Sequence, residues 1–201
     1  MNEKEKIENY SNEFFFKSGF YKITMDEIAK GLSISKKTIY KYFPSKHRLV
    51  DTVMNALQQY IKSKLNKVVE GNENSIVKMR EIAQIFAELS IKLNQNLLFD
   101  LQTHRPDLWD KIEEFRGNLI RNIWENIITQ GKDEGYIIDK PNYIIITIVY
   151  ASIRSVINPT FLLNHNYSIN NAFTITFDIV IKGILTQKGL QVYNKIEKEN
   201  K

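Results

Sequence analysis

The stretch "GFYKITMDEIAKGLSISKKTIYKYFPSK", residues 19–46, combines helix-boundary signals with many lysines and tyrosines. Within it, Glu27 follows Thr24 by three residues. In such a capping box the threonine hydroxyl accepts the amide of the glutamate, whose carboxylate accepts the threonine amide. The pattern predicts a short helix from Thr24 to about Gly31, because glycine lowers helix propensity and the next residues turn the chain.

A second short helix is predicted directly after this turn. Ser35 is a suitable N-cap, and the residues up to Phe43 form about two helical turns before Pro44 ends the helix. Ile39 and Phe43 fall on one side of it and are expected to pack inward. Two short helices joined by a tight turn form the outline of a helix-turn-helix motif, whose second helix enters the DNA major groove.

The charge of the chain is concentrated in the same region. The 201 residues carry a formal net charge of +5. Residues 22–48 contain seven basic residues and two acidic ones, so this segment alone accounts for the excess. Such a segment is expected where a protein contacts phosphates, although a lysine-rich solvated surface has the same composition. Lysine ammonium groups neutralise phosphates, hydroxyls donate to phosphate oxygens, and lysine or threonine reaches base edges.

Helical periodicity continues along nearly the whole chain, and alternating strand patterns are scarce. The fold class is therefore all-α. The nine predicted helices cover about residues 7–18, 24–31, 35–43, 45–68, 76–93, 97–102, 108–130, 141–157 and 170–185.

Residues 19–50 resemble the DNA-binding head of the TetR family of bacterial transcriptional regulators. The glycine before the first turn and the runs "TMDEIA", "SKKTIYKYF" and "PSK" arrive in register. Total length and the nine-helix outline also agree with that family. The resemblance implies a three-helix DNA-binding domain over residues 1–48 and a larger helical ligand-binding and dimerisation domain over residues 49–201.

The resemblance also implies which residues contact DNA. The recognition helix corresponds to Ser35–Phe43, and Thr24 to a residue that caps the second helix and meets a phosphate. Tyr40, Tyr42 and Lys46 correspond to positions used on the DNA backbone. The alternative is a packing role for the tyrosines and a capping role alone for Thr24. The predicted DNA-contacting residues are Thr24, Ser35, Lys36, Lys37, Thr38, Tyr40, Lys41, Tyr42 and Lys46.

Two positions depart from the family pattern. Ser33 stands where the family usually has the turn glycine, so a positive φ at this position would cost about 1 kcal/mol. Lys37 replaces a glycine that is frequent in the recognition helix, and its long basic side chain could alter the bases that are read.

The helix predicted at 141–157 is apolar on nearly all sides, so it requires burial on all sides. The resemblance implies that this helix and the one at 170–185 pair with their symmetry mates in a four-helix bundle; a monomer core is the alternative. In this family the other helices enclose a small-molecule pocket, for which plain core packing is the alternative. The candidate lining residues are Phe86, Leu89, Leu93, Phe99, Trp109, Phe115, Trp124, Tyr150 and Phe161.

Three further residues stand out in the body of the chain. Asp100 and Glu88 are acidic residues in apolar segments, and either could face a cationic ligand or a solvated surface. Pro106 disfavours helix at the residue before it and predicts a break there. Such a joint could transmit ligand binding to the DNA-binding head.

Several functional classes are disfavoured. The absence of cysteine excludes disulfides and thiolate metal sites and indicates a reducing cytoplasm. Residues 1–20 lack the apolar core of a secretory signal. The most apolar run, residues 143–157, is shorter than the roughly 20 residues of a membrane helix. The three histidines belong to no nucleophile elbow or H-E-x-x-H pattern, so we expect no enzyme activity, cofactor or metal.

The sequence therefore predicts a ligand-responsive transcriptional regulator, a repressor that binds a palindromic operator as a homodimer. The proposed control is a population shift, in which a small molecule favours a conformation with wrongly separated DNA-binding heads. A ligand-independent or nucleoid-associated DNA binder is the alternative within this class. A helical small-molecule-binding protein, an interaction module or an enzyme with an incidental helix-turn-helix is the alternative outside it.

Overall fold

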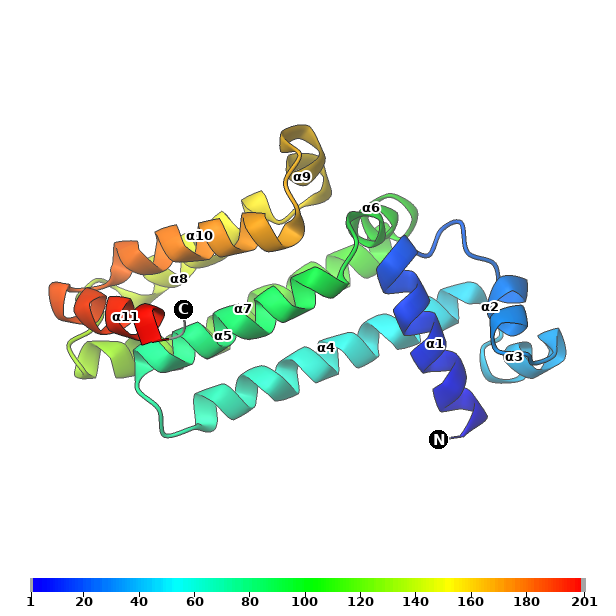
Figure 1. Ribbon diagram of the computed structural model, residues 1–201, viewed down its shortest axis with the longest axis horizontal. Coiled ribbons are helices and arrows are strands. Elements are labelled where there is room, and N and C mark those ends of the chain that lie inside the picture. Colours follow the sequence, from blue (N-terminus) through cyan, green and yellow to red (C-terminus); the bar gives the residue numbers. More distant parts are fainter. Residues whose placement is uncertain (1, 200–201) are drawn as a thin grey trace. The chain divides into compact units, whose positions relative to one another are not determined.

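The computed structural model describes residues 2–199, with side chains described for residues 2–90 and 93–197. Within this part all regular elements are α-helices, and one isolated antiparallel bridge joins Ile137 and Leu185. The helices are α1 (Glu3–Ser18), α2 (Met25–Gly31), α3 (Lys36–Tyr42), α4 (Lys46–Glu70), α5 (Ser75–Lys92), α6 (Gln95–His104), α7 (Pro106–Asp133), α8 (Asn142–Val156), α9 (Pro159–His165), α10 (Ile169–Ile184) and α11 (Gln187–Glu199), drawn in Figure 1. The all-α prediction is confirmed.

Two of these helices were not among the nine predicted. Pro159 is the first residue of α9, where its missing N–H costs nothing. The side chain of Asn158 caps this helix by accepting the Phe161 amide at 3.0 Å. The second addition, α11, begins after Thr186, whose hydroxyl accepts the Gly189 amide at 3.1 Å.

The chain divides into two compact units. The first unit comprises Met1–Ile61 and Lys92–Ile112, and the second comprises Lys62–Ile91 and Glu113–Lys201. The first unit thus combines α1, α2, α3 and the start of α4 with α6, which comes from much later in the chain. The assignment of DNA binding to residues 1–48 and of ligand binding and dimerisation to residues 49–201 remains a prediction.

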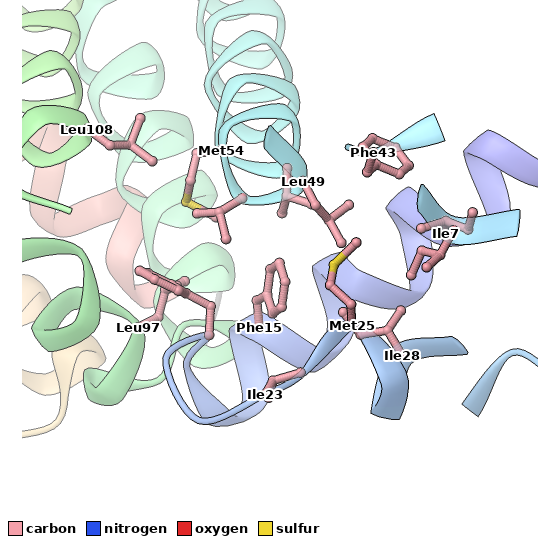
Figure 2. Packing of buried hydrophobic residues seen from close by; sticks show 14 of the residues in the cluster. Ile7, Phe15, Ile23, Met25, Ile28, Phe43, Leu49, Met54, Leu97 and Leu108 are labelled. Carbon is pink, nitrogen blue, oxygen red and sulfur yellow. The ribbon is translucent and has the colours of Figure 1, made fainter. Parts of the chain in front are cut away.

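The core of the first unit holds the helix-turn-helix region in place. Phe15 of α1 is fully buried and meets Phe20 with ring centroids 6.2 Å apart. Figure 2 shows it among side chains from α2, α4 and α6, including Met25, Leu49 and Leu97. Because burial of apolar surface is the main stabilising term in folding, this cluster fixes α2 and α3 against a shared base.

In the second unit, α8 and α10 pack against each other along their lengths (Figure 1). Their inward residues are buried, but a row of isoleucines on the opposite side is exposed, so the burial predicted for all sides of α8 is not met within one chain. The exposed residues are Ile144 and Ile148 on α8 and Ile175 and Ile179 on α10.

Taken singly, no helix within residues 2–199 is long and apolar enough to cross a membrane; α8 and α9, bent by 59° at their junction, meet that test only as a pair.

Candidate nucleic-acid interface

The recognition helix α3 is anchored by one side and exposed on the other. Ile39 and Phe43 are 0% and 2% exposed, as predicted from their spacing. The opposite side presents Lys37, Tyr40 and Lys41 to solvent. A rigid apolar base with a basic and aromatic outer surface is the arrangement that a groove-binding helix needs.

The start of α3 is defined by hydroxyl groups. The Ser35 hydroxyl accepts the Thr38 amide at 3.0 Å, which confirms the predicted N-cap. The same hydroxyl lies 2.8 Å from the Thr38 hydroxyl. These two side chains therefore stabilise the helix start, and one hydroxyl hydrogen of the pair remains able to point outward.

Both ends of α3 are paired with carboxylates from other helices. Lys36 donates to Asp26 of α2 at 2.9 Å, and this bond raises the pKa of the lysine. Tyr42 donates its hydroxyl to Glu3 of α1 at 3.0 Å. The Lys41 ammonium lies 5.1 Å from the centre of the Tyr42 ring, within the range of a cation–π contact.

Thr24 forms the predicted capping box with Glu27. Its hydroxyl accepts the Glu27 amide at 3.1 Å and donates to the Glu27 carboxylate at 2.9 Å. The carboxylate also accepts the Thr24 amide at 2.7 Å, and these bonds lower the pKa of Glu27. The hydroxyl hydrogen of Thr24 is thus occupied within α2.

Lys46 is the first residue of α4 and is half-buried. Its ammonium donates to the backbone carbonyl of Tyr21 at 2.7 Å, and burial lowers its pKa while the charges of Asp100 and Glu27 raise it. Ser45 caps α4 by accepting the Arg48 amide at 3.2 Å. The lysine therefore links the start of α4 to the loop between α1 and α2.

Asp100 of α6 fixes the other side of that loop and had no predicted structural role. It is buried, and one carboxylate oxygen accepts the amides of Phe20 and Tyr21 at 2.7 and 2.8 Å. Gly19 adopts φ 78°, and a Cβ on it would lie 2.4 Å from the same oxygen. Only the glycine permits this approach, so the solvated surface suggested for Asp100 is wrong. The one sequence signal was an acidic residue in an apolar segment.

His104 and Glu88 occupy more exposed positions. The His104 ring of α6 stacks on Tyr21 with centroids 3.5 Å apart, which adds a second contact between α6 and the loop. Glu88 is exposed and accepts a hydrogen bond from Gln84 at 3.1 Å. The solvated alternative for Glu88 is the one that the structure favours.

The break predicted at Pro106 lies between α6 and α7. Arg105 has non-helical backbone angles there, and its buried guanidinium donates to Asp51 of α4 at 2.7 Å and to Asp107 at 2.8 Å. The hydrogen bond from Arg105 lowers the pKa of Asp107 to about 2. This joint therefore ties α6 and α7 to the first part of α4.

The structure distributes the nine pocket candidates over both units. Leu93 and Trp109 pack against the core of the first unit, and Phe99 in the same unit is exposed. In the second unit, Phe86 and Trp124 belong to a string of aromatic rings that Phe173 and Phe177 complete, with successive centroids 5.4, 5.4 and 6.1 Å apart. Leu89, Phe115, Tyr150 and Phe161 also lie in that unit. The pocket itself remains a prediction.

The DNA-contact candidates, in contrast, all lie in the first unit, on α3 and at the starts of α2 and α4. Two features escaped the sequence analysis: the carboxylates that meet Lys36 and Tyr42, and the Asp100 contact with the loop. They depend on how different helices pack, with partners 10 to 80 residues apart, so the spacing within one helix does not signal them. Contact with DNA itself is likewise a prediction.

Comparisons with known proteins agree with this geometry. Residues 11–53 match the sequence model described as bacterial regulatory proteins, tetR family. The chain is 23% identical over 168 residues to the HTH-type transcriptional regulator YvaF of Bacillus subtilis, covering 82% of this chain and 86% of that protein. It is 24% identical over 133 residues to the nucleoid occlusion factor SlmA of Photobacterium profundum, covering 61% and 65%.

The fold extends the likeness beyond the matched residues. A TetR-family transcriptional regulator from Marinobacter aquaeolei superposes with a TM-score of 0.73, over 97% of this chain and 98% of that chain, at 19% identity. Residues 11–53 therefore resemble the DNA-binding segment of bacterial regulatory proteins of the tetR family, and the fold of nearly the whole chain is similar to that of a regulator from this family.

Proposed function

We propose that the protein represses transcription by binding a palindromic operator as a homodimer and that a small molecule releases it. The observation that carries this function is the surface of α3, where lysine, threonine and tyrosine side chains stand on a helix anchored by Ile39 and Phe43. Lysine and tyrosine would supply phosphate contacts, and Lys37 and Thr38 would reach base edges.

The exposed isoleucines of α8 and α10 support a dimer. One chain offers one recognition helix, whereas stable operator binding uses two, about 34–36 Å apart on a two-fold axis. Ile148 and Ile179 are 51% and 66% exposed, and the row that they belong to is unusually apolar for a solvated helix surface. Pairing with the same row of a second chain would bury both.

Control by a small molecule has two supports in the chain. The string of aromatic rings from Phe86 to Trp124 offers planar apolar surface to a ligand. Asp100 and Arg105 connect α6 to the loop before α2 and to α4, so a ligand that displaces α6 would move the groups at the starts of both helices. The regulator would act in the cytoplasm, where its DNA is.

A ligand-independent, nucleoid-associated DNA binder is the second candidate. It is favoured by the likeness to the nucleoid occlusion factor SlmA, which covers 61% of this chain. Such a protein would bind DNA with the same α3 surface, but no metabolite would release it. An enzyme or a ligand-binding protein with an incidental helix-turn-helix would show no sequence-specific retention of DNA.

The test is a selection from genomic fragments that include the region upstream of the protein's own gene. We expect a palindrome to be retained, and Lys37→Ala and Tyr42→Phe to weaken its retention. For each phosphate that a variant no longer neutralises, the negative slope of log affinity against log salt concentration should become shallower by about one. The exposed Lys67→Ala on α4 is the matched control and should bind normally. Equal retention of all fragments would contradict the repressor function, and release by a metabolite would contradict the second candidate.

A further inference from the structure

Two side chains at opposite ends of α3 donate hydrogen bonds to carboxylates of neighbouring helices. At the first position, Lys36 meets Asp26 at 2.9 Å, and at the last position the Tyr42 hydroxyl meets Glu3 at 3.0 Å. Both are among the groups expected to meet DNA phosphates. A carboxylate and a phosphate are anions that accept the same hydrogen bonds, so each carboxylate occupies a donor that DNA would use.

Neither carboxylate takes part in the capping box of its own helix. The capping box of α1 is formed by Asn2 and Glu5, which leaves Glu3 outside it. The capping box of α2 is formed by Thr24 and Glu27, and Asp26 takes no part in it. Both side chains are exposed, and their described polar contacts are those with α3 and its lysine or tyrosine.

A phosphate that replaces the carboxylate at either donor would come within a few ångströms of the displaced negative charge. Repulsion at that distance in water corresponds to about a three- to fivefold loss of affinity, and it falls away as salt rises. The repulsion acts on the DNA backbone and is therefore independent of base sequence.

We propose that Glu3 and Asp26 are internal competitors of DNA phosphate, which hold the two ends of the recognition helix in the free protein and reduce its affinity for DNA of any sequence. This inference rests on the proposed DNA-binding function and adds two acidic residues to its control. The cost of displacing them is part of every binding event, since the contacts lie on the protein and not on the operator.

The test uses the full chain and a labelled duplex of about 30 base pairs with random sequence, long enough for two half-sites one helical turn apart. Glu3→Gln is compared with Glu13→Gln, an equal charge change at an exposed position about 15 Å further along α1. Glu3→Gln should bind about three- to fivefold more tightly near 0.05 M salt, with the difference lost near 0.5 M. Asp26→Asn should change affinity in the same direction.

A second background separates competition from simple charge. In Tyr42→Phe the hydroxyl that Glu3 holds is gone, so most of the gain from Glu3→Gln should disappear. An equal gain in both backgrounds, or an effect of Glu3→Gln no larger than that of Glu13→Gln, overturns the inference. Misfolding cannot imitate the expected result, because it would weaken binding. If neither the wild type nor any variant binds the duplex at low salt, the proposed function fails, and the inference fails with it.

Discussion

Ser33 adopts a left-handed backbone conformation, with φ 54°, in the turn between α2 and α3. The turn is closed by its amide, which donates to the Lys30 carbonyl at 3.1 Å, and by the Ile34 amide, which donates to Ala29 at 3.0 Å. A side chain with a Cβ is strained in this region, and glycine is not. The positive φ expected if the turn follows the family pattern is therefore present, and the serine bears its cost.

Replacement of this serine by glycine should stabilise the protein. We expect Ser33→Gly to raise the free energy of unfolding by about 0.5–1 kcal/mol, after the greater entropy of glycine in the unfolded chain is subtracted. Urea denaturation measures the change. Asn166, with φ 53° after α9, is the control, since asparagine tolerates this conformation and Asn166→Gly should be nearly neutral. A loss of stability in Ser33→Gly would show that the hydroxyl makes a compensating contribution.

The capping residues could be predicted because their signals are local. Thr24 and Glu27 are three residues apart, and Ser35 precedes its helix directly, so spacing alone identifies them. Asp100 could not be predicted in the same way. Its partners are the amides of Phe20 and Tyr21, 80 and 79 residues away, and a backbone amide leaves no mark in the sequence.

The junction of α6 and α7 depends on a single buried guanidinium. Arg105 pairs with Asp51 and Asp107 and is shielded from water more than either carboxylate. The same guanidinium thus joins α4, through Asp51, to the start of α7, through Asp107. Removing the arginine would break both ion pairs at once. The sequence predicted the break at Pro106 but not this pairing, which requires α4 beside the junction.

The free energy of unfolding should decrease at acidic pH because of Asp107. Its folded pKa of about 2 lies below the ordinary value near 3.9, because the carboxylate accepts hydrogen bonds from Arg105. The charged form therefore favours the folded state; this contribution is complete above about pH 4 and is lost as pH falls through 2. Urea midpoints between pH 4 and 2 should show a smaller pH dependence in Asp107→Asn than in the wild type. Arg105→Gln should reduce it as well, and an unchanged dependence in both variants would contradict the assignment.

Helices α9 and α11 show where helix prediction failed. Both begin after N-cap residues, Asn158 and Thr186, of types that commonly cap helices. α9 has only seven residues, too few for apolar periodicity to identify a helix. α11 is amphipathic, with Leu190 and Tyr193 at helical spacing, but its apolar residues are few and most of the segment is polar. Packing stabilises α11 instead, since Tyr193 is buried and bonds to Asp178 of α10 at 3.3 Å.

The proposed dimer makes the most direct prediction for the assembled protein. Ile148→Glu or Ile179→Glu would place a charge in the paired isoleucine rows, where burial without a partner is costly. We expect either variant to sediment as a monomer and to lose operator binding, with helix content unchanged. Tyr60→Glu, a similar change at an exposed position of α4, should remain a dimer. A dimer that survives both isoleucine changes would place the interface elsewhere.

The hydrophobic core of the first unit is complete only when a late part of the chain has been synthesised. Phe15 and Met54 share their core with Leu97 and Leu108, which follow Ile61 by more than thirty residues. At about 5–20 residues per second, a ribosome completes the early part several seconds before these partners emerge. During this interval the helix-turn-helix segment would lack part of its hydrophobic core and would be accessible to chaperones and proteases. For the same reason, residues 1–48 transferred alone into a chimeric regulator would lack part of their core, and α6 should be transferred with them.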